Sequence, residues 1–442
     1  MITAIENFSK LFLEKTENKK IQIISHFDTD GISSAAIISK TLERISKQFS
    51  IKILKQLDKE EIALFPKDKL LIILDLGSGS LDYLSELKNE IFIIDHHEIT
   101  NKQIPENIHI MNPHLLENYE NLCAAELCYL FSKSISQENK DLSYLAILGM
   151  IGDTMEKDIS KTRDRIIKEA DIQVKKGLLI YPSTRPIDKA LEYSARPFIP
   201  GVTGSSKGTY ELLKEAGIEK TGNCFKSLME LDEFEMKKLV TTVALRLSAK
   251  ESSEHIGNFY LIKIFNRLED ARELSAIINA CSRMGKPEIA LLLCLKNPAA
   301  RKKAERMYFK YRQHIISGLR YIDQNNKIQG REYVIINAKD NIKDTLIGTL
   351  ASIISFSQVY REGTIIIAMA YNNDKIKISA RMAGRNPKSP RNLKELMESI
   401  TNLLGGESGG HKQAAGCIIN KEDENKFIEL IKKKLEYELI KV

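Results

Sequence analysis

The chain has 442 residues, of which 43% are hydrophobic and 28% are charged, and its formal net charge is +7. This length exceeds one ordinary hydrophobic core, so we expect two or three domains. No apolar run approaches the roughly 20 residues of a membrane helix, and the N-terminal residues lack the apolar stretch of a signal peptide. We therefore expect a cytoplasmic protein that does not enter a membrane, and its mildly basic charge is compatible with an anionic substrate.

The first 180 or so residues alternate short apolar runs with helical patterns. Short apolar segments that are rich in β-branched residues predict buried strands at 21–25, 69–76, 90–97 and 108–111. Apolar residues at helical spacing predict helices at 32–47, 121–150 and 160–175. Strands that alternate with helices predict an α/β fold with a parallel sheet.

The remainder of the chain divides into a connecting region and a second α/β pattern. Residues 181–255 combine a proline- and glycine-bearing loop with helical segments, which predicts a helical connecting region. After it we expect strands at 258–265, 288–295, 332–338 and 364–371, and one long basic amphipathic helix at 300–322. The sequence therefore predicts two α/β domains that flank a catalytic cleft, with the three parts at 1–180, 181–255 and 256–442.

Acidic residues and histidines follow the predicted strands of the first part. Open α/β sheets bind ligands at the carboxyl ends of their strands. Divalent ions such as Mg²⁺ and Mn²⁺ prefer carboxylate oxygens, and Mn²⁺ also accepts imidazole, so these residues could hold two ions about 3.5–4 Å apart. The residues are His26, Asp28, Asp30, Asp75, Asp95, His96, His97 and Asp153.

Each of these clusters has a structural alternative when it is taken alone. An Asp-x-Asp pair after a strand is often a turn or a helix N-cap. A single aspartate at a strand end is usually structural, and His96 with His97 could be a surface pair. The four clusters together favour a metal site, because chance rarely places all of them at element ends in an apolar frame.

The segments HFDTDGISS, LDLGSG, DHH and GDT, in this order, resemble the four motifs of the DHH phosphoesterase superfamily. The resemblance implies two divalent ions, Mn²⁺ first and Mg²⁺ as the alternative. It implies that His97 contacts the scissile phosphate, that Asp95 orients a histidine, and that His97, Asp75 and Asp153 are the catalytic residues. The metal ligands that it implies are His26, Asp28, Asp30, Asp75, His96 and Asp153.

The segment GGESGGHKQAAG at 405–416 resembles the signature of the DHH-associated domain. Closely spaced glycines let backbone N–H groups approach an anion, which predicts phosphate contacts from Gly409, Gly410 and His411. The segment KIKISARMAGR resembles the strand in which that domain presents a phosphate-binding arginine. Arg381 is the first candidate for this role and Arg385 the second. The structural alternatives are a glycine-rich turn and a solvated arginine.

The segments ARPFIPGVTGS and LEDARELSAIINACSRMGKPEIAL are similar to archaeal RecJ-like proteins, the group that includes the GINS-associated nuclease. Asn279 and Arg283 could contact a nucleic-acid backbone or pack between helices. The resemblance implies an exonuclease that hydrolyses phosphodiester bonds of single-stranded DNA or RNA from an end and releases mononucleotides. Such an enzyme would act in DNA repair, DNA replication or RNA turnover, with a replication or helicase protein as a further partner.

Two other functions stay open at this point. The first is a phosphodiesterase for short oligonucleotides (nanoRNA) or cyclic dinucleotides, which shares both signature domains. The second is a non-catalytic replication scaffold that binds a GINS- or helicase-type partner. A scaffold would be expected to have lost metal-binding residues, whereas this chain has an acid or a histidine at every implied position.

Overall fold

The computed structural model describes residues 2–99, 103–116, 119–194, 197–247, 254–357, 359–384 and 389–437. The chain forms two compact units, Met1–Tyr308 and Phe309–Val442. Across the described residues, no helix is both long and apolar enough to cross a bilayer.

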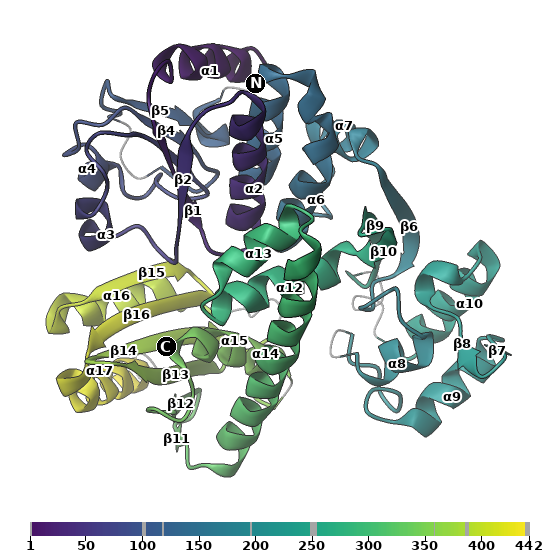
Figure 1. The fold of residues 1–442 in the computed structure, drawn as a ribbon. Coiled ribbons are helices and arrows are strands. Elements are labelled where there is room, and N and C mark those ends of the chain that lie inside the picture. Colours follow the sequence, from purple (N-terminus) through teal and green to yellow (C-terminus); the bar gives the residue numbers. More distant parts are fainter. Residues whose placement is uncertain are drawn as a thin grey trace. The chain divides into compact units, whose positions relative to one another are not determined.

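A five-stranded sheet forms the core of the N-terminal part of the first unit (Figure 1). All its strands are parallel, which confirms the predicted α/β class. Their order is β2-β1-β3-β4-β5, with β1 (Ile21–His26), β2 (Phe49–Leu54), β3 (Leu70–Leu74), β4 (Ile91–Ile94) and β5 (Ile108–Met111). The edge strand β2 was not predicted, because Ser50 and Lys52 interrupt its apolar run and most of its residues are half-buried.

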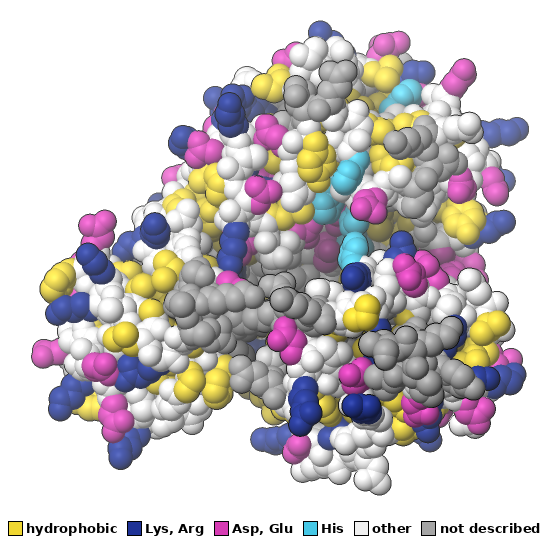
Figure 2. Space-filling model, turned by 180° about the vertical axis from the view of Figure 1, so that it is seen from behind, with side chains coloured by type: hydrophobic (Ala, Val, Ile, Leu, Met, Phe, Trp, Pro, Cys, Tyr) yellow, Lys and Arg dark blue, Asp and Glu magenta, His cyan; other side chains and the backbone are white. Residues whose placement is uncertain are grey.

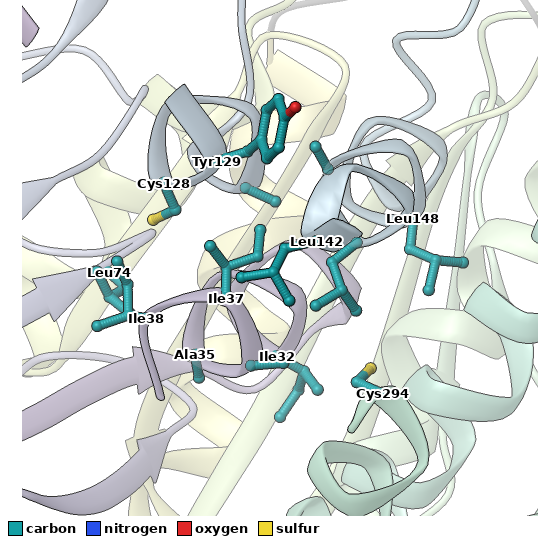
Figure 3. Packing of buried hydrophobic residues seen from close by; sticks show 14 of the residues in the cluster. Ile32, Ala35, Ile37, Ile38, Leu74, Cys128, Tyr129, Leu142, Leu148 and Cys294 are labelled. Carbon is teal, nitrogen blue, oxygen red and sulfur yellow. The ribbon is translucent and has the colours of Figure 1, made fainter. Parts of the chain in front are cut away.

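Successive residues of the central strands face two different cores. Ile72 and Leu74 of β3 lie in the larger core, whereas Leu71 and Ile73 lie in the smaller one. Burial on both faces explains the nearly continuous apolar strand sequences. The larger core contains residues of α1 (Ile2–Lys15), α2 (Thr29–Arg44), α5 (Ala124–Ile135) and α6 (Ser143–Gly152). The smaller core contains residues of α3 (Lys59–Ala63) and α4 (Leu81–Leu84). Figure 3 shows α2 packed in the larger core through Ile32, Ile37 and Ile38.

Three further helices follow one another along the chain: α12 (Ala271–Arg283), α13 (Pro287–Cys294) and α14 (Pro298–Gln324). The helix α12 packs against α6, and α13 packs against α2. The strand expected at 288–295 was wrong: α13 begins there with Pro287 in its first turn, and its apolar run is rich in leucine rather than β-branched residues. The long helix expected at 300–322 is confirmed as α14. Residues 256–308, placed in the third part from sequence, lie in the first compact unit because their apolar side chains join its core.

The middle of the chain combines short helices with a small antiparallel sheet. Its helices are α7 (Lys161–Glu169), α8 (Ile187–Glu192), α9 (Ser206–Glu215) and α10 (Glu233–Ala244). The sheet has the order β10-β9-β6, with β6 (Ile172–Leu178), β9 (Ile256–Ile264) and β10 (Arg267–Asp270). A two-stranded hairpin joins β7 (Lys220–Thr221) to β8 (Cys224–Phe225). The helical connecting region is therefore present, but the polar strand β6 was not predicted, since it depends on pairing with the distant β9.

A six-stranded mixed sheet forms the second unit, with the order β11-β12-β13-β14-β16-β15. The helix α15 (Asp344–Phe356) covers one face, and α16 (Leu393–Leu404) with α17 (Glu424–Tyr437) covers the other. Only β12 and β13 are parallel among its paired strands. The strands are β11 (Ile328–Gln329), β12 (Tyr333–Asn337), β13 (Ile365–Asn372), β14 (Lys375–Met382), β15 (Glu407–His411) and β16 (Ala414–Asn420). This sheet confirms the predicted C-terminal α/β domain.

Candidate metal centre

The predicted metal-binding residues come together at the carboxyl ends of three neighbouring strands. The strand β1 ends at His26, and Asp75 follows β3. His96 follows β4, which lies next to β3 in the sheet. Asp153 caps the C-terminus of α6. Figure 2 shows several histidine and acidic side chains gathered on one face of the molecule.

Asp75 lies at the centre of this group. His26 Nδ1 is 3.1 Å from Asp75 Oδ2 and 3.0 Å from Asp28 Oδ2. The other oxygen, Asp75 Oδ1, is 3.4 Å from His96 Nε2. The backbone of Asp75 has a φ of +56°, which is uncommon for a residue other than glycine and turns the chain sharply after β3. Such strained conformations are concentrated at functional sites.

His96 joins the remaining carboxylates to this centre. Its Nε2 is 3.1 Å from Asp153 Oδ2 and 4.0 Å from Asp30 Oδ2. All six predicted ligands therefore lie in one connected cluster. A donor set of carboxylates with imidazole suits a divalent ion, Mn²⁺ better than Mg²⁺, since Mg²⁺ prefers oxygen ligands alone.

The cluster divides into three overlapping groups, each with its possible ligand atoms within 4.8 Å of one another. Asp75 and His96 each belong to two of these groups, so the arrangement offers donors for more than one ion. Asp75 Oδ1 is buried and accepts no hydrogen bond from the described residues, so it is available to a cation. The residues present therefore fit a divalent-metal site. The groups are Asp75 with His96 and His97, His26 with Asp28 and Asp75, and Asp30 with His96 and Asp153.

The electrostatics of the cluster also favour a bound cation. Burial and the nearby carboxylate of Asp28 raise the pKa of Asp75 to about 6. Burial, together with Asp75 and Asp153, raises the pKa of Asp30 well above its usual value. Burial lowers the pKa of His96, but the nearby carboxylates of Asp153 and Asp75 outweigh burial and raise that pKa to about 12. Divalent ions would relieve this repulsion between carboxylates.

Asp30 is fully buried, and backbone N–H groups hold its carboxylate. The backbone N–H groups of Ala124 and Ala125, at the start of α5, donate to its two oxygens at 2.8 and 2.9 Å. A helix N-terminus stabilises a carboxylate in this position. Gly149 of α6 also approaches closely, since a Cβ there would lie 2.3 Å from Asp30 Oδ1. The position of Asp30 is therefore fixed by two helices.

A buried ion pair supports the start of α5, and sequence reasoning missed it. Glu126 accepts a hydrogen bond from the N–H of Cys123 at 2.9 Å and pairs with Arg163 at 2.6 Å. Both charged side chains have zero exposure. Glutamate at the third helical position is a known capping signal, so the sequence could have indicated Glu126. No local signal marks Arg163, which belongs to another helix.

Asp95 organises the loop after β4. One of its oxygens accepts from the N–H of His96 at 2.8 Å and lies 2.7 Å from His97 Nδ1, and the other accepts from the N–H of Ser78 at 3.0 Å. The hydrogen bond to Asp95 raises the pKa of His97. The side chain of His97 is 54% exposed, and its Nδ1 is 3.9 Å from Asp75 Oδ1. Asp95 thus contacts the side chain of His97 and the backbone of His96.

Apart from His97, the predicted phosphate-binding residues lie in the second unit. Arg381 of β14 donates from Nε to Ser352 Oγ at 2.9 Å and from Nη1 to the carbonyls of Ala380 and Ala415. Gly409, Gly410 and His411 are exposed on β15. The second arginine candidate, Arg385, is outside the described residues.

Two other residues from the sequence analysis lie on α12, in the first unit. Asn279 Oδ1 accepts a hydrogen bond from the N–H of Thr29 at 3.1 Å, so it packs between helices. The guanidinium of Arg283 lies 5.9 Å from the ring centre of Phe27, next to His26.

Three family models match this chain. They are the DHH family N-terminal domain at residues 20–152, the DHH-CID domain at 180–257 and the DHHA1 domain at 330–436. An uncharacterized protein of Methanocaldococcus jannaschii is 28% identical, over 97% of this chain and 96% of that protein.

Solved structures with a similar fold include RecJ from Thermus thermophilus in complex with Mn²⁺. It matches with a TM-score of 0.61 and 18% identity over 98% of this chain, which spans 54% of that RecJ chain. CDC45 from Entamoeba histolytica matches with a TM-score of 0.67 and 13% identity, over 97% of this chain and 98% of that one. At these identities the likeness concerns the fold.

Proposed function

The chain is a protein of the DHH/DHHA1 phosphoesterase superfamily, and from that premise we propose that it is a metal-dependent exonuclease. Its substrate would be single-stranded DNA or RNA, from which it hydrolyses phosphodiester bonds at an end and releases mononucleotides. It would act in DNA repair, DNA replication or RNA turnover, where a replication or helicase protein is a further partner. The observation that carries the proposal is the convergence of all six donor residues on Asp75 and His96.

The metal site would hold two divalent ions, Mn²⁺ first and Mg²⁺ as the alternative. Its ligands would be His26, Asp28, Asp30, Asp75, His96 and Asp153, whose atoms form the clusters described above. When bound, the ions would lower the pKa of a water and offset negative charge on the phosphate. The protein fixes these ligands in advance: Asp30 by the start of α5, and Asp75 by the tight turn after β3.

The remaining residues would bind and orient the substrate. His97 is half-exposed beside the cluster, and Asp95 holds its Nδ1, so its Nε2 would be presented to the scissile phosphate. In the second unit, Arg381 would bind a substrate phosphate through its guanidinium, whose plane is fixed by Ser352 and two carbonyls. The N–H groups of Gly409 and Gly410, with the side chain of His411, would add further donors.

The +7 net charge and the basic helix α14 support a polyanionic substrate.

The alternatives to an exonuclease are a phosphodiesterase for nanoRNA or cyclic dinucleotides and a non-catalytic scaffold. The complete donor set argues against the scaffold, and the middle region at 180–257 favours a polymer over a dinucleotide.

The proposal can be tested with single-stranded DNA and RNA oligomers that carry a label at one end or the other. We expect Mn²⁺-dependent, stepwise release of mononucleotides from long strands, and the label that is released first gives the polarity. Cleavage limited to strands of two to five nucleotides would favour the short-oligonucleotide function. No cleavage with any divalent metal would favour the scaffold.

The matched variants are Asp75→Asn and Asp68→Asn. Asparagine keeps the shape of aspartate and removes one charge, so Asp75→Asn should lower the rate at least about 1,000-fold. Asp68 is exposed before the opposite end of β3, and its substitution should leave the rate unchanged. Equal rates for both variants would contradict the proposed site.

A further inference from the structure

The helix α12 contacts the chain between two of the metal-binding residues. Thr29 lies between Asp28 and Asp30 and is buried. Its N–H donates to Asn279 Oδ1 at 3.1 Å, although the two residues are 250 positions apart in sequence. Its hydroxyl donates to the carbonyl of Ser275 and accepts from the Ser275 hydroxyl, each at 3.1 Å. Three hydrogen bonds therefore join α12 to the first residue of α2.

The hydrogen bond from Thr29 to Asn279 satisfies a group that α2 cannot satisfy by itself. The first N–H groups of a helix have no partner within the helix. Asp28 caps α2, but its Oδ1 accepts from Gly31. Asn279 supplies the acceptor for Thr29 instead. A buried N–H without an acceptor is unfavourable, so this bond fixes the first turn of α2 and with it both flanking carboxylates.

The N-terminal end of α12 contacts the loop that carries the fourth motif. Arg272 forms an ion pair with Glu156, three residues after Asp153. Glu156 is 8% exposed, and its second oxygen is buried without a hydrogen bond to the described residues. The start of α2 and the end of α6 also touch each other, since a Cβ on Gly152 would lie 2.7 Å from Thr29 Cβ. One helix thus contacts both segments, at positions two turns apart.

We propose that Asn279 and Arg272 are positioning residues that set the spacing of the metal-binding loops. Neither would touch an ion. Asn279 acts on Asp28 and Asp30 through Thr29, and Arg272 acts on Asp153 through Glu156. This inference rests on the proposed metal-dependent function. It also assigns Asn279 a role other than contact with a nucleic-acid backbone, since its side-chain oxygen is occupied by Thr29.

The test measures Mn²⁺ binding by calorimetry and turnover on single-stranded oligomers for the full-length chain. Asn279→Ala removes the acceptor and should weaken Mn²⁺ binding about 10–100-fold, the usual effect of losing a residue that orients ligands. Asn279→Asp keeps an acceptor oxygen and should restore binding to near the wild-type level. Arg272→Gln provides a second variant at the other loop and should weaken binding in the same direction.

The matched control is Ser282→Ala. Ser282 is buried on the same helix, and its hydroxyl makes no hydrogen bond to the described residues, so this change should leave Mn²⁺ binding unaltered. Wild-type affinity and turnover in Asn279→Ala would overturn the inference. So would a fall in melting temperature without metal that leaves Mn²⁺ affinity intact, since that result indicates packing alone.

The experiment also separates this inference from the proposed function. If the wild type binds Mn²⁺ but cleaves no strand, the exonuclease proposal fails, and the binding data still decide the role of α12. If the wild type cleaves strands and Asn279→Ala behaves as Ser282→Ala does, only the inference fails. Absence of Mn²⁺ binding to the wild type would overturn both.

Discussion

The candidate metal centre of the first unit and the glycine–histidine hairpin β15–β16 of the second unit differ in how far their polar groups are exposed to water. Asp30 and Asp75 are buried to 1% exposure or less, and other parts of the fold hold them in place. Gly409, Gly410 and His411 are exposed on an edge strand. Buried charges need partners within the fold because water cannot solvate them, whereas exposed donors can exchange water for a substrate.

The difference leads to distinct mutational effects. In the first unit, changes to supporting residues should lower stability or metal affinity even where no ligand is altered. In the second unit, changes to exposed donors should act mainly on substrate affinity and leave the fold intact wherever the backbone accommodates the new side chain.

The largest effect is expected for the buried ion pair below the start of α5. Arg163→Met leaves Glu126 charged and unpaired in a fully buried position. We expect the free energy of unfolding to fall by about 3–5 kcal/mol, as is usual when one partner of a buried pair is removed. Urea denaturation measures the change. Mn²⁺ affinity should fall as well, because the same helix end holds Asp30.

Two further variants test the cause of that loss. Arg165→Met changes an exposed arginine on the same helix and should alter stability by less than about 0.5 kcal/mol. Adding Glu126→Leu to Arg163→Met removes the unpaired charge and should recover part of the stability. Equal losses for Arg163→Met and Arg165→Met would contradict the role of the buried pair.

His97 occupies an intermediate position, since it is beside the buried cluster and half-exposed. His97→Gln should lower kcat about 100-fold through loss of its contact with the phosphate, while Mn²⁺ affinity changes only a few-fold. His114→Gln, at an exposed histidine beyond β5, serves as the control. An equal loss of Mn²⁺ affinity would instead make His97 a metal ligand, which its distance to Asp75 also permits.

The sequence predicted the parts of the site that follow from local pattern. Each proposed ligand lies at or near the end of a strand or helix, and the carboxyl ends of parallel strands meet at one edge of a sheet. This reasoning is sufficient to bring His26, Asp75 and His96 together. The glycine motif at 405–416 was found for a similar reason, because its spacing is local, but its hairpin structure was not predicted.

The supporting contacts could not be predicted, because they join distant segments. Arg163 meets Glu126 across two helices, and Asn279 meets Thr29 across most of the first unit. The helix α13 was mistaken for a strand because a short apolar run is compatible with either structure. Tertiary packing determines whether such a run forms a helix or a strand, and the spacing of residues in the sequence does not indicate that packing.

The two neighbouring glycines of the hairpin allow a sharper test of the second unit. Gly410 has a φ of +134°, and a Cβ there would lie 2.4 Å from the carbonyl oxygen of Ala414. Gly410→Ala should therefore lower the free energy of unfolding by about 1–3 kcal/mol. A Cβ on Gly409 meets no atom within 4 Å, so Gly409→Ala should keep the stability and raise KM. An unchanged KM in Gly409→Ala would remove this glycine from the phosphate site.

The smallest effect is expected at Arg381. Three hydrogen bonds, from Nε and Nη1 to Ser352, Ala380 and Ala415, fix the plane of its guanidinium. Lysine keeps the charge but can neither make all of these bonds nor present a planar fork to a phosphate. We expect Arg381→Lys to raise KM about tenfold, which corresponds to roughly 1.4 kcal/mol, with kcat and Mn²⁺ affinity nearly unchanged. Arg361→Lys, at an exposed arginine of the same unit, should change neither constant. If Arg381→Lys instead lowered Mn²⁺ affinity, the division of labour between the two units would be wrong, because a residue of the second unit would then be supporting the metal centre.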